Sequence, residues 1–145
     1  MSQRTGAIVS LQLCHGHRKP MTIVDEAEAI ANLGLKTDRH AIADSSRQVL
    51  LIEQEALDEL QLRPGQVKEN ITTLNIDLRN LRFKDRLHIG KEVILEITQS
   101  CSPCSRMEEL RPGLKQEIAG RRGMLARVIQ GGTIRLGDTI RILQL

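Results

Sequence analysis

The chain has 145 residues, with 21 Lys and Arg against 18 Asp and Glu, which gives a formal net charge of +3. It has no Trp and no Tyr, and Phe83 is its one phenylalanine. This length predicts a single domain, 1–145, with a core of Leu, Ile and Val. The missing aromatics argue against stacking on nucleic-acid bases and against aromatic cages. The interspersed charges argue against binding nucleic acid or membranes through bulk charge.

The compartment is inferred from the N-terminus and the cysteines. The segment MSQRTGAIVSLQL is too polar for a secretory signal, and no run approaches the roughly 20 apolar residues of a membrane span. Three cysteines are an odd number, which favours free thiols over a disulfide framework. We therefore expect a cytoplasmic protein.

The first half of the chain predicts strands with one helix. Residues 7–13 alternate between apolar and polar side chains, as in a strand with one buried face. Residues 24–33 are ambiguous between a short helix and an extended segment. Residues 48–52 form a short apolar run typical of a buried strand, and 53–60 carry strong helix formers. Residues 67–73 look extended again, with Lys68 and Asn70 on the face opposite Ile71.

The second half predicts hairpins. Residues 87–98 form a hairpin through Gly90-Lys91, and 113–119 form a short helix after Pro112. The glycine-containing turns between residues 124 and 143 predict a β-meander that closes a barrel. Together these elements indicate a mainly β, barrel-rich domain with two or three short helices.

The motif richest in chemistry is Cys101-Ser102-Pro103-Cys104, directly after a strand expected to end near Thr98. It is compatible with a redox pair, with half of a zinc site, or with one reactive thiolate at Cys104 that Arg106 helps to ionise. Two inert small side chains in a turn remain the plain alternative. The motif alone does not decide among these readings.

Two further clusters could contribute. Cys14, His15 and His17 could complete a zinc site with the cysteine pair, although nothing in the spacing brings the two segments together. In Asp38-Arg39-His40, the Asp–His pair could orient a general base and Arg39 could hold a phosphate or carboxylate. The alternative is a turn in which the aspartate caps the backbone and the arginine is solvated.

Taken together, these segments resemble the molybdenum-cofactor sulfurase C-terminal (MOSC) domain family, particularly its small stand-alone bacterial members. The resemblance extends from about Ala7 to Leu143, and the order and spacing of the stretches make it specific. The matching stretches are GLKTDRHA at 34–41, RQVLLIEQEALDEL at 47–60, PGQVKENITTLNIDL at 64–78, DRLHIGKEVILEITQSCSPC at 85–104, RRGMLARVIQGG at 121–132 and IRLGDTI at 134–140.

The resemblance implies a closed β-barrel of complex topology and a reactive cysteine, Cys104, that binds the molybdenum of a pterin cofactor or carries sulfur as a persulfide. A thiolate suits both roles. Lys68 takes a place often held by Arg in the family, and loses the bidentate fork for phosphate. Thr37 and Lys84 replace glycines of the usual family pattern, which suggests slightly different turns.

The resemblance thus implies a sulfur carrier or a protein that binds the molybdenum cofactor, molybdopterin. Cys104 would be the sulfur acceptor or molybdenum ligand, and Cys101 would resolve a persulfide on it. The residues implied to bind the cofactor are Asp38, Arg39, His40, Lys68, Asn70, Arg106 and Arg122. The expected partner is a sulfur donor such as a cysteine desulfurase, or a molybdoenzyme, and an oligomer would also fit. A non-catalytic adaptor and a zinc-stabilised barrel are the alternatives, and enzyme and carrier are not distinguished.

Overall fold

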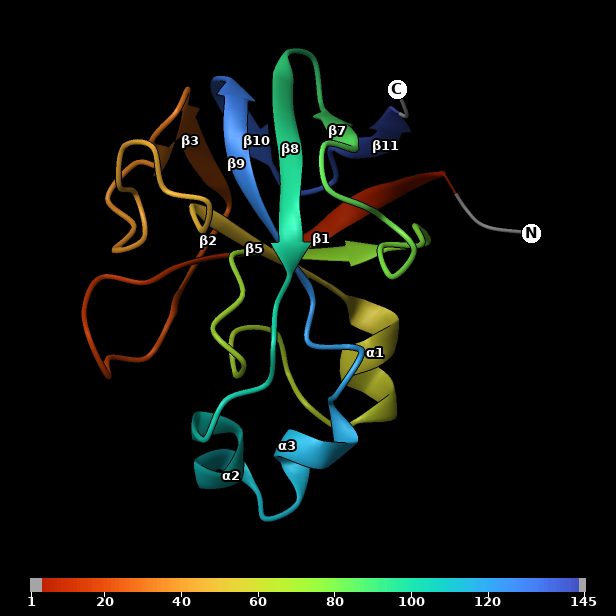
Figure 1. Ribbon diagram of the computed structural model, residues 1–145. Helices are drawn as coiled ribbons and strands as arrows, with labels where there is room; N and C mark the ends of the chain where they lie inside the picture. Colours follow the sequence, from red (N-terminus) through yellow and green to blue (C-terminus); the bar gives the residue numbers. More distant parts are fainter. Residues whose placement is uncertain (1–3, 144–145) are drawn as a thin grey trace.

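The computed structural model describes residues 4–143, which form strands and three short helices (Figure 1). The elements are β1 (Thr5–Leu13), β2 (Thr22–Val24), β3 (Glu26–Ile30), β4 (Gly34–Leu35), β5 (Val49–Glu53), α1 (Gln54–Glu59), β6 (Ile71–Leu74), β7 (Arg86–Ile89), β8 (Val93–Ser100), α2 (Arg106–Leu110), α3 (Leu114–Glu117), β9 (Met124–Gln130), β10 (Gly132–Arg135) and β11 (Thr139–Leu143). The predicted class, mainly β with a barrel and two or three short helices, is confirmed.

The barrel has seven strands in the order β11-β7-β8-β9-β5-β6-β1, and β1 pairs with β11 to close it. Among these pairings β5–β6 is parallel and the others are antiparallel. The short strand β2 pairs with β1 beside the closed ring. Closure leaves no long unpaired edge among the seven strands. The spatial order departs from the chain order, which confirms the complex topology.

The predicted C-terminal meander is wrong, although the C-terminal strand does close the barrel. Strand β10 pairs with β3 in a separate three-stranded sheet, β10-β3-β4, instead of following β9 around the barrel. The glycines before it explain the departure. A Cβ on Gly131 would lie 2.5 Å from the Ala29 carbonyl oxygen, and Gly132 has a φ of +152°. These glycines let the chain turn out of the barrel at close range to β3. The ambiguous 24–33 segment is extended: it begins with the last residue of β2 and contains β3.

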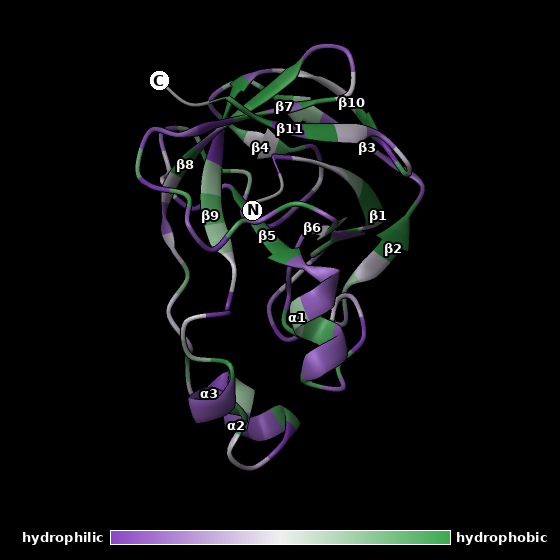
Figure 2. Ribbon diagram, turned by 90° about the vertical axis from the view of Figure 1, so that its right-hand side faces the viewer, coloured by the Kyte–Doolittle hydropathy of each residue, from purple (hydrophilic) through white to green (hydrophobic). Residues whose placement is uncertain are grey.

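Two aliphatic clusters hold the fold together. The larger fills the barrel, and the smaller joins α1 to α2 and α3. The smaller one is formed by Ile52, Ala56, Leu57, Leu60, Leu62, Val67, Met107, Leu114 and Ile118. The three helices lie together at one end of the barrel in both views (Figures 1 and 2). None of the helices within residues 4–143 is long and apolar enough to cross a membrane.

The segment before β6 differs from its prediction as an extended strand from 67. Strand pairing begins at Ile71, and Lys68 adopts a left-handed backbone with a φ of +68°. Because this residue interrupts the alternation, Val67, Glu69 and Asn70 are all buried. Asn70 is therefore an interior residue and not part of a solvent-facing strand.

Candidate functional site

Two adjoining cavities lie beside the paired residues Leu50 of β5 and Leu125 of β9, near the end of β8 and the start of β6. The first, here called the Asn70 cavity, has a volume of about 120 Å³ and is lined by His40, Arg47, Leu50, Lys68, Asn70, Cys101, Arg122 and Leu125. The second, here called the cationic basin, has a volume of about 220 Å³ and is lined by Cys14, Gly16, His17, Arg18, Lys19, Arg39, His40, Lys68, Arg106 and Arg122. Three residues, His40, Lys68 and Arg122, line both.

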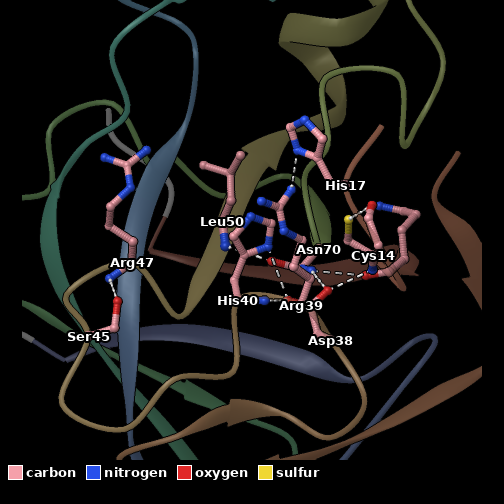
Figure 3. Close-up of polar contacts among 11 residues, drawn as sticks. Cys14, His17, Asp38, Arg39, His40, Ser45, Arg47, Leu50 and Asn70 are labelled. Atoms are coloured by element: carbon pink, nitrogen blue, oxygen red, sulfur yellow. Dashed lines mark hydrogen bonds and ion pairs between the residues drawn. The ribbon is translucent and has the colours of Figure 1, made fainter. Parts of the chain in front are cut away.

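The cationic basin carries basic groups and no acidic one among its lining residues. The surroundings of His17 affect the pKa of its side chain. Partial desolvation and the charges of Arg39, Arg106 and Arg18 all lower the pKa of its imidazole. A guanidinium nitrogen of Arg39 lies 3.1 Å from His17 Nδ1, and Figure 3 shows the two side chains meeting. Concentrated positive charge of this kind attracts an anion.

Asp38 organises the polar wall behind these cavities and lines neither of them. Its Oδ1 accepts hydrogen bonds from the Cys14 backbone N–H (2.7 Å) and from Asn70 Nδ2 (3.1 Å), and its Oδ2 accepts one from the His40 backbone N–H (3.0 Å). Burial raises the pKa of Asp38, but hydrogen bonds from His40 and Cys14 outweigh it, and the net pKa is lowered. The charged Asp38 thus holds His40 and Asn70 in place (Figure 3).

Asn70 joins three segments through its side-chain amide. Its Oδ1 accepts a hydrogen bond from the Leu50 backbone N–H at 3.0 Å, and its Nδ2 donates to the Gln12 carbonyl at 3.2 Å and to Asp38. The residue is 1% exposed. The side chain of Lys68 is also held, because its Nζ donates to the Lys19 carbonyl at 2.8 Å. These contacts fix the floor of the cavity and attach the 15–19 loop to it.

Arg122 lies at the junction of the two cavities and is unusual in its bonding. It is 6% exposed, yet its Nε and Nη1 atoms are buried without a hydrogen-bond partner. Its electrostatic neighbour Glu69 is also buried. Burial raises the pKa of Glu69, against hydrogen bonds to its carboxylate and the charge of Arg122. A buried guanidinium with free donors is costly unless something else binds it.

The three cysteines are free and lie in different surroundings. Cys101 is buried and lines the Asn70 cavity, whereas Cys104 is exposed and lines neither cavity. Cys14 is buried, lines the basin, and its Sγ lies 3.4 Å from the Gly16 carbonyl oxygen. The structure therefore places Cys101 inside the site and Cys104 outside its walls, two residues before the lining residue Arg106.

Most of the residues predicted to bind a cofactor come together here. The cavities gather Arg39, His40, Lys68, Asn70, Arg106 and Arg122, with Asp38 behind them. The sequence predicted His17 only as a possible zinc ligand and gave no role to Arg18 or Lys19, but all three line the basin. The density of cations in the basic 15–19 run was the available signal. Within residues 4–143, no group of three or more His, Cys, Asp or Glu side chains is placed to hold a metal ion, so the zinc alternative has no ligand cluster there.

Comparison with known proteins agrees with this architecture. The YuaD protein from Bacillus subtilis superposes with a TM-score of 0.83 at 17% identity, over 100% of both chains. YiiM from Geobacillus stearothermophilus superposes with a TM-score of 0.76 at 18% identity, over 96% of this chain and 75% of that one. YiiM from Escherichia coli gives 0.68 at 20% identity, over 100% and 71%. These likenesses establish a shared fold.

Sequence comparison adds a relative and a family. A protein of Gibberella moniliformis named a reductase is 33% identical over 84 residues, which are 55% of this chain and 15% of that protein. This chain therefore matches only a small part of that relative's length. The family model described as the MOSC domain matches residues 36–141. That match covers β5 to β10 together with most of β11, and it includes every lining residue from Arg39 to Leu125. The chain belongs to the MOSC domain family.

Proposed function

We propose that this protein binds a phosphate-bearing molybdenum cofactor in the cationic basin and the Asn70 cavity, and that the exposed Cys104 thiol beside them carries sulfur or ligates the metal. The observation that carries the proposal is Arg122, whose buried guanidinium nitrogens lack partners where the two cavities meet. A phosphate oxygen would supply the missing acceptor. The family match supports the choice of cofactor.

The donors of the site suit a phosphorylated ligand. Arg39, Arg106 and Arg122 provide guanidinium groups, and Lys68 adds an ammonium group. Charge-assisted hydrogen bonds from such groups to phosphate are shorter and stronger than neutral ones. Because the chain has no Trp or Tyr, the pterin rings would be held by hydrogen bonds and charge and not by stacking on those residues. In this proposal His40 and the walls around Asn70 would do this.

The two thiols would play different parts. An exposed thiol at Cys104 is accessible to the terminal sulfur of a protein persulfide on a sulfur donor such as a cysteine desulfurase. The Cys104 thiolate would attack that sulfur, the S–S bond of the donor would break, and the donor would leave as a thiolate. Cys104 would then carry the persulfide. A thiolate or persulfide is also a soft ligand, which suits the molybdenum of the bound cofactor.

The test compares wild type with Cys104→Ser and the matched Cys101→Ser, all purified from cells that make the cofactor. We expect wild type and Cys101→Ser to gain one sulfur atom by intact-mass measurement after incubation with a persulfide donor, and Cys104→Ser not to gain it. All three should retain the oxidised pterin detected by fluorescence, because the phosphate contacts remain. Sulfur uptake by Cys104→Ser equal to that of wild type would refute the role of Cys104.

The same purification tests cofactor binding. We expect Arg39→Met and Lys68→Met each to lower the pterin content, because each removes a cation from the basin. A wild-type protein with neither pterin nor sulfur would favour a non-catalytic adaptor that docks a cofactor-processing partner. The fungal relative is named a reductase, which supports measuring reductase activity in any preparation that retains the cofactor.

A further inference from the structure

A third cavity adjoins the Asn70 cavity at Cys101 and Arg122. Its volume is about 170 Å³, and it is enclosed by the end of β5, the start of α1, and the segments 78–79, 100–103 and 120–124. Cys101 and Arg122 line both this cavity and the Asn70 cavity. We call it the Met124 cavity, after the first residue of β9 in its wall. The proposed cofactor does not account for it.

One part of the wall of the Met124 cavity is aliphatic, and the rest carries arginine, glutamate and serine side chains. Ile52, Ala56, Leu78 and Met124 line it, and each is buried. An engineered apolar cavity of about 150 Å³ in another protein is large enough to bind benzene. A volume of about 170 Å³ therefore suits a small organic molecule with an apolar body. The ligand would be about the size of one aromatic ring or a short aliphatic chain.

The charges around the cavity leave one cation free. Glu53 Oε1 lies 3.8 Å from Arg79 Nε, and Glu53 Oε2 accepts the Leu78 backbone N–H at 2.7 Å. Arg121 forms an ion pair with Glu59. These contacts leave Arg122, whose Nε and Nη1 have no hydrogen-bond partner.

Glu69 does not supply a hydrogen-bond acceptor for Arg122. It interacts electrostatically with Arg122, but its Oε2 accepts from Gly65 N–H and Thr72 Oγ1, and its Oε1 has no hydrogen-bond partner. The buried donors of Arg122 therefore lack an acceptor, and a bound anion would provide one. The aliphatic part of the wall suits an anion that also carries an apolar body.

We propose that the Met124 cavity binds a small organic monoanion, with its carboxylate on Arg122 and its apolar body against Ile52, Leu78 and Met124. Cys101 lies in the wall between this ligand and the Asn70 cavity. Arg122 has two unpartnered nitrogens, Nε and Nη1, so it would donate from one to this carboxylate and from the other to the phosphate of the cofactor. The binding site itself stands without the proposed cofactor, because it rests on Arg122 and the aliphatic walls.

Benzoate and its neutral isostere benzamide provide the probes. Protein without pterin, labelled at the Ile, Leu and Met methyl groups, is titrated with each while methyl NMR spectra are recorded. We expect benzoate to shift the signals of Ile52, Leu78 and Met124 to saturation, and benzamide to bind about tenfold more weakly or worse, since it cannot make the charged hydrogen bonds. Equal binding of the two probes would overturn the proposal.

Two arginine variants test the anchor. Arg122→Met should weaken benzoate binding about tenfold or more, whereas Arg121→Met in the same cavity should change it less than about threefold, because Arg121 is already paired with Glu59. Arg122→Met keeps much of the side-chain volume, and replacing a buried charge by an apolar group is often tolerated. Arg122→Lys keeps the charge and serves if the Met variant does not fold.

The residues whose methyl signals shift distinguish this proposal from the proposed cofactor site. Benzoate shifts confined to Leu50 and Leu125 would place the anion in the Asn70 cavity and overturn a site in the Met124 cavity. Such a result would leave the proposed cofactor site intact. Conversely, a protein that never contains pterin but shows the Ile52, Leu78 and Met124 shifts would retain this site and lose the proposed function.

Discussion

Among single residues, Asn70 connects three segments of the candidate site, because its amide bonds to Leu50, Gln12 and Asp38. In Asn70→Ala the Leu50 N–H loses its acceptor in a buried setting, and Asp38 loses one donor. A buried group left without a partner costs about 1–3 kcal/mol. We expect the free energy of unfolding to fall by about this amount, measured by urea denaturation.

The control for Asn70→Ala is Asn80→Ala. Asn80 is exposed, and its Nδ2 donates to Asp77 Oδ2 at 2.8 Å. Loss of this surface contact should change the free energy of unfolding by less than about 0.5 kcal/mol. An Asn70→Ala protein as stable as the control would contradict the bonding described for the amide.

Single residues also mark where sequence reasoning reached its limit. The resemblance to a family placed Asn70 and Lys68 in the site, but the alternating pattern predicted a strand there and put Asn70 on its open face. One left-handed residue, Lys68, with a φ of +68°, removed that alternation. Thr37 and Lys84, where the sequence suggested slightly different turns, also have a left-handed backbone, with φ of +70° and +79°. Non-glycine residues give little local signal for this conformation.

At the scale of elements, Glu96 of β8 connects β7 and β9. The strand register places Arg86 and Arg127 opposite it, and both donate two hydrogen bonds to its carboxylate at 3.0–3.2 Å. Burial raises the pKa of Glu96, but the hydrogen bonds from Arg127 and Arg86 outweigh it, and the net pKa is lowered. The ionised carboxylate is thus the form that stabilises the folded barrel.

The sign of this pKa shift sets the pH dependence. Because the pKa is lower in the folded state, the stabilisation is present above the ordinary glutamate pKa and is lost as the pH falls through the folded value. We expect Glu96→Gln to lower the free energy of unfolding by about 1 kcal/mol at pH 7, a modest value because solvent screens the half-exposed arginines. The difference from wild type should shrink toward pH 3 in urea denaturation series.

Glu26→Gln is the matched control for Glu96→Gln. Glu26 lies 3.8 Å from Arg135 and both side chains are largely exposed, so this ion pair should contribute little at any pH. A Glu96→Gln effect that does not depend on pH would rule out the charge of Glu96 as its cause.

The elements themselves could be predicted, but their partners could not. The strands at 7–13, 48–52 and 87–98 and the helix at 53–60 follow from hydrophobic pattern and helix propensity, and they are present. The position of β10 depends on contact with β3, about a hundred residues earlier in the chain, for which periodicity gives no signal. Helix α2 has five residues and no side-chain cap, so it also lacks the usual start signal.

At the scale of the whole molecule, the two proposed ligands share one wall because the barrel brings distant segments to the same end. Cys101 follows β8 and Arg122 precedes β9, and these two strands pair over much of their length. Cys101 N–H also donates to the Gly123 carbonyl at 2.8 Å. The thiol and the guanidinium are therefore held together by the barrel itself. Their positions depend on its closure.

Closure occurs where β1 pairs with β11, and Gly6 of this seam lies directly against residues 74–76. Gly6 lies opposite Ile140 of β11, and a Cβ on it would come within 2.2 Å of the Leu74 carbonyl oxygen and 2.9 Å of Ile76 Cβ. Because β1 is also paired with β6, it cannot move away from Leu74 without disturbing the seam. Gly6→Ala should therefore lower the free energy of unfolding by about 2–3 kcal/mol in urea denaturation.

The control is Gly16→Ala, where an added Cβ would meet the flexible side chain of Lys19 at 3.0 Å and not backbone. Its effect should stay within about 0.5 kcal/mol of zero. A Gly6→Ala protein equal in stability to this control would show that the contact between Gly6 and residues 74–76 is looser than these distances indicate. Because closure holds the ends of β8 and β9 in place, a loosened seam in Gly6→Ala should also weaken benzoate binding at the Met124 cavity.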